Sequence, residues 1–214
     1  MDNGIRAVIF DLDGVICHTD RYHYLAWKAL ADRLGIPFDE KVNQRLRGVS
    51  RRESLEIILG ERGAAYTETE KQAMMEEKNE IYKSYLAAMT PDDLPPETRI
   101  TLQMLRQRGY LLAIGSSSKN TRQILEQLGL GGFFDAVADG TQITRSKPDP
   151  EVFLLAASLL GVEPRNAVAV EDAASGVQAA RSGGFRVIGV CSNGSDPRAD
   201  ITIRGVDDLV EIFC

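Results

Sequence analysis

The chain has 214 residues, of which 43% are hydrophobic and 26% charged, an ordinary globular composition that excludes disordered and fibrous classes. Its formal net charge of −6 disfavours nucleic acid as a partner, because binding a phosphate backbone needs a basic face. We expect neither a membrane span nor a secretory signal, since no apolar run approaches the ~20 residues that cross a bilayer and the N-terminus has no basic region followed by a long apolar one.

The first predicted element is a buried strand at residues 5–10, an apolar run that ends abruptly at the polar turn 11–14. From about residue 20 to residue 90 the apolar residues recur at steps of three and four, which predicts helices. These helices are expected around 25–34, around 55–59 and from 67 to 89. Gly35 can end the first of them, and Thr67 with Glu70 has the spacing of a capping box at the start of the third.

After the prolines between 91 and 96, predicted strands and helices alternate. Strands are expected at 111–114, 136–138, 167–170 and 186–190, and helices around 102–105, 124–128, 152–160 and 173–181. Such alternation predicts an α/β fold, a parallel sheet with helices on both faces. We therefore expect an α/β core at 1–14 and 92–214, interrupted by an all-helical insertion at 15–91.

Reactive side chains follow the predicted strands. They are Asp11 and Asp13, Ser116, Lys147, and the pair Glu171 and Asp172. Because the carboxyl ends of parallel strands meet at one edge of a sheet, where α/β proteins bind ligands, these groups should lie close together. Singly, each has an ordinary explanation as a turn residue or a helix N-terminus. Their joint order favours a site.

The chemistry of these groups indicates phosphoryl transfer. The Asp11 carboxylate can attack phosphorus and form an aspartyl phosphate. Mg²⁺ prefers oxygen ligands, and Asp11 and Asp172 would supply them, with Glu171 helping directly or through a water.

Three further side chains complete the predicted mechanism. Ser116 offers a hydroxyl donor and Lys147 a positive charge to the phosphoryl oxygens. Asp13, two residues beyond the nucleophile, is placed for general acid and base catalysis.

At this point the chain resembles a known superfamily. The order of DLDGV at 11–15, GSSSKN at 115–120, SKPDP at 146–150 and VEDAASG at 170–176 is similar to the four motifs of the haloacid dehalogenase superfamily. The resemblance covers the whole core. It implies a Rossmannoid sheet with an inserted helical cap domain, an aspartyl intermediate at Asp11, and Mg²⁺ bound by Asp11, the Asp13 backbone carbonyl and Asp172. The dehalogenase branch is not expected to keep an acid/base aspartate at position 13.

Within that superfamily the insertion closely resembles the cap of the β-phosphoglucomutase family, on segments 22–30, 47–54 and 78–79. The resemblance implies that substrate is bound by His23, Arg47, Gly48, Val49, Ser50, Arg51, Ser54 and Lys78 in the cap, and by Ser118, Lys119 and Asn120 in the core. It also places His23 and Lys78 in a network that governs Asp13 and cap closure. Trp27 is a further candidate contact, although its neighbours Tyr24 and Leu30 favour packing in the cap.

The loop at 47–51 supports this interpretation on physical grounds. It joins two predicted helices, so that backbone N–H groups, a serine hydroxyl and the forked guanidinium of Arg51 can face one anion. A solvated surface loop is the alternative. Arg47 stands where Lys would be unsurprising, and the two cations differ in geometry, so its contact stays open.

The resemblance implies interconversion of β-D-glucose 1-phosphate and D-glucose 6-phosphate through phospho-Asp11 and β-glucose 1,6-bisphosphate, with one Mg²⁺ per subunit. The bisphosphate is both intermediate and activator. One alternative is a sugar-phosphate phosphatase, in which water discharges phospho-Asp11; a non-catalytic binding domain is disfavoured by the intact set of reactive residues. Cys17, Cys191 and Cys214 are odd in number and widely spaced, which argues against a disulfide framework and favours a reducing cytoplasm. We expect a monomer.

Overall fold

A computed structural model describes residues 4–46, 49–191 and 198–213. The chain divides into two compact units, one formed by Met1–His18 with Met89–Cys214 and the other by Thr19–Ala88. We call them the core unit and the cap unit. The sequence predicts a catalytic core at 1–14 and 92–214 and a cap domain at 15–91, and these roles and bounds remain predictions. No helix in the described ranges combines the length and the apolar character that a bilayer crossing needs.

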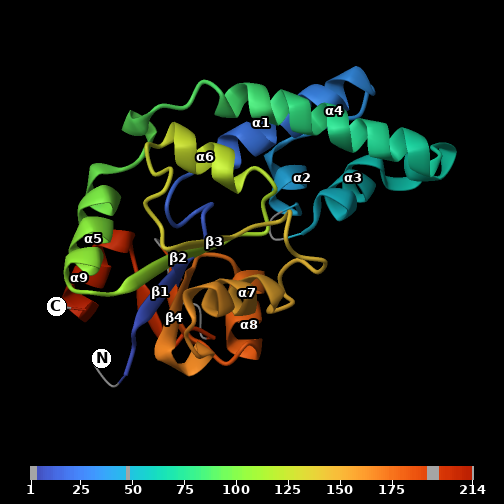
Figure 1. Cartoon of the computed structure of the whole chain (residues 1–214). Helices are drawn as coiled ribbons and strands as arrows, with labels where there is room; N and C mark the ends of the chain where they lie inside the picture. The colour runs from blue at the N-terminus through green and yellow to red at the C-terminus, as the bar shows by residue number, and fades with distance from the viewer. Residues whose placement is uncertain (1–3, 47–48, 192–197, 214) are drawn as a thin grey trace. The chain divides into compact units, whose positions relative to one another are not determined.

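The core unit is built on a parallel sheet, which in the described residues has six strands in the order β3-β2-β1-β4-β5-β6 (Figure 1). The strands are β1 Ala7–Phe10, β2 Leu111–Gly115, β3 Ala136–Ala138, β4 Ala167–Glu171, β5 Arg186–Val190 and β6 Ile201–Ile203. The predicted α/β class is confirmed. Phe10 pairs with Ile114 on one side and Val170 on the other, so the chain order reverses beside β1. Ligands of open α/β sheets bind at such a reversal, outside the carboxyl ends of the strands.

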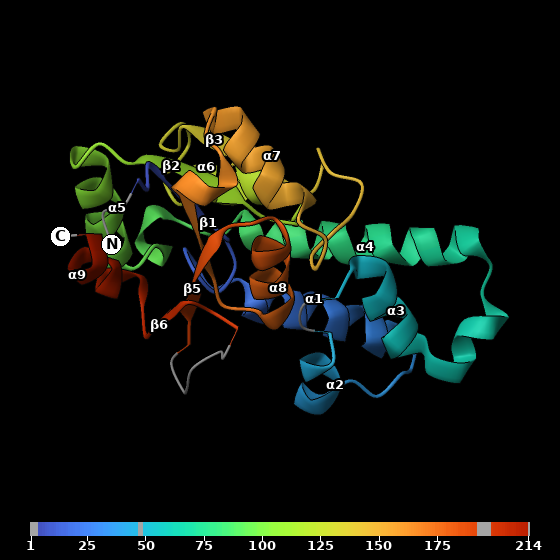
Figure 2. The ribbon, with the colours of Figure 1, turned by 90° about the horizontal axis from the view of Figure 1, so that it is seen from below.

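Helices cover both faces of this sheet. They are α5 Pro96–Gln107, α6 Thr121–Gln127, α7 Glu151–Leu160, α8 Ala174–Ser182 and α9 Leu209–Phe213. Since crossovers between parallel strands are almost always right-handed, the reversal of the strand order puts α7 and α8 on the face opposite α5 and α6. Phe153 and Ala156 of α7 pack with Ile9 of β1 in one buried apolar cluster. Figure 2 shows α5 beside α9, and the two helices are in contact.

The cap unit consists of α1 Asp20–Arg33, α2 Glu40–Gln44, α3 Arg51–Leu59 and α4 Glu68–Leu86 within the described residues. Trp27 and Leu30 of α1, Leu55 of α3 and Met74 of α4 share one buried apolar cluster, which holds the helices together. The predicted capping box at Thr67 is confirmed: its side chain accepts from the N–H of Glu70, whose carboxylate accepts from the N–H of Thr67.

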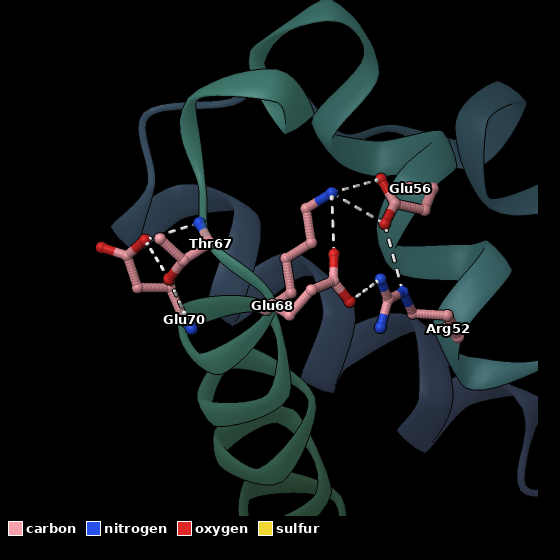
Figure 3. A network of polar contacts seen from close by, with 6 residues as sticks. Arg52, Glu56, Thr67, Glu68 and Glu70 are labelled. Carbon is pink, nitrogen blue, oxygen red and sulfur yellow. Dashed lines mark hydrogen bonds and ion pairs between the residues drawn. The ribbon is translucent and has the colours of Figure 1, made fainter.

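Polar contacts also join α3 to the first turn of α4 (Figure 3). Lys71 Nζ lies 3.0 and 3.1 Å from the two carboxylate oxygens of Glu56. Arg52 bridges Glu56 and Glu68. Arg52 and Glu68 are exposed, Glu56 is half-buried and Lys71 is buried. Because water screens ion pairs of exposed groups, the buried apolar cluster carries most of the packing energy.

Among the α-helices and strands of the described residues, three were not predicted: α2, β6 and α9. Each has at most five residues, and α2 has no buried residue, so no apolar period marks it. The helix expected to reach residue 89 ends at Leu86. Short 3₁₀ helices lie at Gly60–Ala65, Pro91–Asp93, Pro164–Asn166 and Val206–Asp208.

Candidate active site

Asp11 lies directly after β1, at the carboxyl edge of the sheet. Its N–H donates to the carbonyl of Val170 at 2.9 Å, so the chain stays aligned with β4 one residue beyond the strand. Ser116 follows the neighbouring strand β2, and its N–H donates to the carbonyl of Ala138 at 3.1 Å. Both residues are buried. The sheet therefore positions a carboxylate and a hydroxyl at adjacent strand ends, as the sequence predicts.

Lys147 reaches this edge from the loop before α7. Its Nζ lies 2.6 Å from Asp11 Oδ1 and 2.6 Å from Glu171 Oε1. The ammonium group also lies over the ring of Phe153, 4.6 Å from its centroid. Burial lowers the pKa of Lys147, but attraction to the two carboxylates outweighs it, so the pKa is raised and the side chain stays cationic. A fixed positive charge therefore lies beside Asp11.

Asp11, Glu171 and Asp172 form a cluster of carboxylates, with one oxygen from each within 4.8 Å of the others. Burial raises the pKa of Glu171, an effect that Lys147 opposes and Asp11 reinforces. The N–H of Ala173 donates to Glu171 Oε2 at 2.7 Å and fixes that side chain. An all-oxygen donor set of this size fits a Mg²⁺ ion, which takes carboxylates and completes its shell with water or phosphate oxygens.

Two glycines allow these carboxylates to come close to the backbone. A Cβ on Gly14, where φ is +87°, would lie 2.1 Å from Asp172 Oδ2. A Cβ on Gly176 would lie 1.8 Å from Glu171 Oε1. Any larger residue at either position would displace a carboxylate of the cluster, so the glycines of the DLDGV and VEDAASG motifs are required sterically.

Asp13 lies in the tight turn after β1 and is half-buried. The turn is closed by the N–H of Gly14, which donates to the carbonyl of Cys17 at 2.7 Å. The carboxylate cluster does not include the Asp13 side chain among its members. Its expected roles, in proton transfer and through its backbone carbonyl in metal binding, stay predictions.

The loop after β2 carries the core-side residues expected to bind substrate. Ser116 Oγ accepts from the N–H of Ser118, and Ser118 Oγ accepts from the N–H of Asn120, each at 3.2 Å. Lys119 is exposed, whereas Asn120 is buried. Since Ser116 Oγ uses a lone pair to accept, its own hydrogen can be donated to an anion.

In the cap unit, His23 and Lys78 are joined as the resemblance implies, with Lys78 Nζ 2.8 Å from His23 Nδ1. The imidazole stacks on Tyr82 with ring centroids 4.0 Å apart, and the hydroxyl of Tyr82 lies 2.9 Å from Thr19 Oγ1. The Lys78 ammonium also lies 5.0 Å from the ring centroid of Trp27, which is buried in the cap cluster. The structure thus brings three of the predicted cap residues together.

His23 is held neutral by its surroundings. Burial lowers its pKa well below 6.5, and the nearby charges of Lys78 and Arg51 lower it further. Because the Lys78 ammonium donates, Nδ1 accepts and the ring proton resides on Nε2. A neutral histidine with one defined N–H is the consequence.

Arg51 begins α3, and its Nη2 donates to Asn79 Oδ1 on α4 at 2.9 Å. Ser50 serves as the N-cap of the same helix, in a capping box with Glu53 that the sequence analysis did not anticipate. Ser54 is buried and Val49 is half-buried. Arg47 and Gly48, also predicted to bind substrate, lie outside the described residues.

Two aromatic residues of these clusters were missed by sequence reasoning. Tyr82 stands four residues after Lys78 on α4, a spacing that places both on one helix face and could have pointed to it. Phe153, beneath Lys147, carries no such signal, because its partner lies in the loop before α7.

Comparisons with known proteins show which family the chain is similar to. The family model described as haloacid dehalogenase-like hydrolase matches residues 5–184. The chain is 43% identical to a β-phosphoglucomutase of Bacillus subtilis over 207 residues, which are 96% of this chain and 92% of the relative. It is also 33% identical over 199 residues to a phosphorylated carbohydrates phosphatase of Thermotoga maritima, covering 91% of this chain and 89% of the relative.

Among solved structures, the chain is similar to a β-phosphoglucomutase from Clostridium difficile, with a TM-score of 0.90 and 36% identity. The match covers 98% of this chain and 96% of that one. Both the sheet and the helical insertion are therefore included in the similarity.

Proposed function

The chain belongs to the haloacid dehalogenase-like hydrolase family, and on that premise we propose that it is a β-phosphoglucomutase. The reaction is the interconversion of β-D-glucose 1-phosphate and D-glucose 6-phosphate through phospho-Asp11 and β-glucose 1,6-bisphosphate. Phosphoryl transfer is supported most directly by the contact of Lys147 with Asp11 and Glu171, at the point where the strand order of the sheet reverses. The similarity to two β-phosphoglucomutases supports the sugar phosphate as substrate.

Asp11 exchanges the phosphoryl group with the sugar in two steps. In the first, the C6 hydroxyl of β-glucose 1-phosphate attacks phospho-Asp11; the new P–O bond forms to O6, the bond to Asp11 breaks, and the hydroxyl proton passes to Asp13. The bisphosphate then reorients. In the second, the Asp11 carboxylate attacks the phosphorus at C1, and Asp13 returns the proton to the departing O1, giving glucose 6-phosphate.

Lys147 and Ser116 act on the charge of the transferring group. Lys147, fixed at 2.6 Å from Asp11, offsets repulsion between an anionic nucleophile and an anionic phosphoryl group. Ser116 donates its hydroxyl to a phosphoryl oxygen. Asp11, Glu171 and Asp172 would hold one Mg²⁺, which when bound supplies further positive charge to the phosphoryl oxygens.

Residues 15–91 are proposed to select the substrate as a cap domain. Arg51 would bind the phosphate that is not being transferred, because its forked guanidinium suits phosphate oxygens. The other proposed substrate contacts are His23, Trp27, Arg47, Gly48, Val49, Ser50, Ser54 and Lys78 in the cap, and Ser118, Lys119 and Asn120 in the core. The Ser50 hydroxyl would bind substrate in addition to capping α3.

We further propose a monomer in the cytoplasm. Of the two cysteines in the described residues, neither Cys17 nor Cys191 forms a disulfide, which supports a reducing compartment. Light scattering of the purified chain would test the monomer.

The deciding experiment follows conversion of β-glucose 1-phosphate to glucose 6-phosphate in a coupled assay. The wild type should convert the sugar, and Asp11→Asn should not, because an amide is a far poorer nucleophile than a carboxylate. A phosphatase is the second candidate, favoured by the similarity to the carbohydrate phosphatase of Thermotoga maritima. Release of inorganic phosphate as the main product would select it over the mutase.

A further inference from the structure

Asp139 is a buried carboxylate that the proposed mechanism does not use. It follows β3 at the same carboxyl edge that carries the candidate active site, and it is only 1% exposed. Its Oδ1 accepts from the N–H of Thr141 at 2.8 Å and from the Thr141 hydroxyl at 2.5 Å. Its Oδ2 lies 3.2 Å from Nε of Arg122, on α6. The carboxylate therefore ties the turn after β3 to the helix that follows the Ser116 loop.

Gly140, the next residue, lies directly against that loop. Its N–H donates to the carbonyl of Ser118 at 3.0 Å. A Cβ on Gly140 would lie 2.2 Å from the carbonyl oxygen of Ser117 and 3.0 Å from the nitrogen of Lys119. The contact is with backbone atoms, which cannot rotate away as a side chain can. Only glycine allows the turn to approach so closely.

Ser118 transmits this contact to the hydroxyl of Ser116. The Ser118 carbonyl accepts from Gly140 and, at 2.9 Å, from the hydroxyl of Thr121. The N–H of Ser118 in turn donates to Ser116 Oγ at 3.2 Å. Moving the Ser117–Ser118 peptide would therefore change the direction in which the Ser116 hydroxyl donates.

We propose that Asp139 and Gly140 are positioning residues for phosphoryl transfer. Asp139 holds the turn rigid through Thr141 and Arg122, and Gly140 presses that turn against the Ser117–Ser118 peptide and so orients the Ser116 hydroxyl toward the phosphoryl group. The inference rests on the proposed function of Ser116. Neither residue is required to touch substrate.

Gly140→Ala tests the contact. Real Cβ atoms stay at least 3.0 Å from other heavy atoms. The Ser117 carbonyl oxygen, which would lie 2.2 Å from the new Cβ, must therefore move by about 0.8 Å. Misplacement of that size in a catalytic group costs up to about 10²-fold in rate. With Mg²⁺ present, phosphorylation of the variant by acetyl phosphate should slow by that order, and so should turnover of β-glucose 1-phosphate.

Gly205→Ala is the matched control. Its Cβ would lie 2.5 Å from Asp207 Oδ1, a clash in the turn after β6, which is three strands away from β1 in the sheet. Its phosphorylation rate should stay at the wild-type value when both variants are assayed well below their unfolding midpoints. A wild-type rate in Gly140→Ala, or an equal loss in both variants, would overturn the proposal.

Asp139 has its own test in a graded pair. Asp139→Ala should slow phosphorylation, and Asp139→Asn should recover part of the rate, because the amide oxygen can still accept from Thr141 although the contact with Arg122 is lost. Asp135→Ala is the control: Asp135 accepts from the N–H of Leu112 and from Arg106, each at 2.8 Å, before β3 at the other edge. It should lower stability and leave the rate unchanged. Equal rates for Asp139→Ala and Asp139→Asn, or an equal loss in Asp135→Ala, would reject the positioning role.

The phosphorylation assay also separates this inference from the mutase. A wild type that acetyl phosphate phosphorylates but that converts no sugar phosphate would end the mutase proposal, and the variant rates would still decide the roles of Asp139 and Gly140. A wild type that is never phosphorylated would overturn both.

Discussion

His23, which is half-buried in the cap unit, should make that unit less stable at mildly acidic pH. The pKa of His23 is lowered well below 6.5 in the folded chain. As the pH falls, His23 therefore takes up a proton in the unfolded chain at a higher pH than in the folded chain. The stabilisation is fully present above pH 6.5 and is lost as the pH falls toward the folded-state pKa. Replacing His23 by Asn removes the titrating group, while its amide oxygen can still accept from Lys78.

The size of the effect follows from proton linkage. If the folded ring does not titrate above pH 5.5, the unfolded chain gains almost one proton relative to the folded one between pH 7.5 and pH 5.5. The contribution of His23 to the free energy of unfolding then falls by at most about 1.4 kcal/mol over that range. Carboxylates titrate too, so the quantity to compare is the difference between the wild type and His23→Asn.

Trp27, the only tryptophan of the chain, reports on the cap unit. Urea unfolding followed by its fluorescence at pH 7.5, 6.5 and 5.5 would give the free energy at each pH. His18→Gln is the control: it removes the other histidine of the chain, which is exposed, and should keep the wild-type pH dependence. The same pH dependence in His23→Asn as in the wild type would refute the argument.

Other perturbations test the charges of the site. Arg51→Ala should slow turnover of β-glucose 1-phosphate by roughly 10–150-fold, a loss of about 1.5–3 kcal/mol, yet spare phosphorylation by acetyl phosphate, which has no second phosphate. An equal loss of rate in both reactions would indicate that Arg51 supports folding of the cap and does not bind the second phosphate. Lys147→Met leaves the buried carboxylates of Asp11 and Glu171 without their cation. In urea unfolding it should destabilise the metal-free chain by about 3–5 kcal/mol, and an unchanged unfolding midpoint would contradict the ion pairs. Chelation should stop turnover and Mg²⁺ restore it, and turnover that survives thorough chelation would contradict the metal proposal.

Much of the fold could be predicted from local sequence. Residues Ala7–Phe10 are all apolar because β1 is buried on both faces, and a strand of that kind is recognisable without tertiary information. The capping box of Thr67 and Glu70 is equally local, since both hydrogen bonds form within one turn. Asp11, Ser116 and Glu171 were identifiable because each stands where an apolar strand ends, and parallel strands share that edge.

The short elements could not be predicted, because too few of their residues are buried to produce a periodic pattern of apolar residues. β6 pairs only with β5 in the described residues and has three residues. α2 buries none of its side chains, and α9 has a single turn. Their conformations depend on neighbours far away in the chain.

The contacts that complete the candidate site were decided by tertiary structure alone. Lys147 is 136 residues from Asp11 and 24 from Glu171, and only the strand order and the path of the loop before α7 bring its ammonium between them. Tyr82 stacks on His23 because α1 packs against α4. Asp139 follows a strand of only three residues and carries no local signal, and its turn lies against the Ser116 loop because β3 pairs with β2. Local periodicity records which face of an element is buried, but the partner on that face is set by how the elements pack.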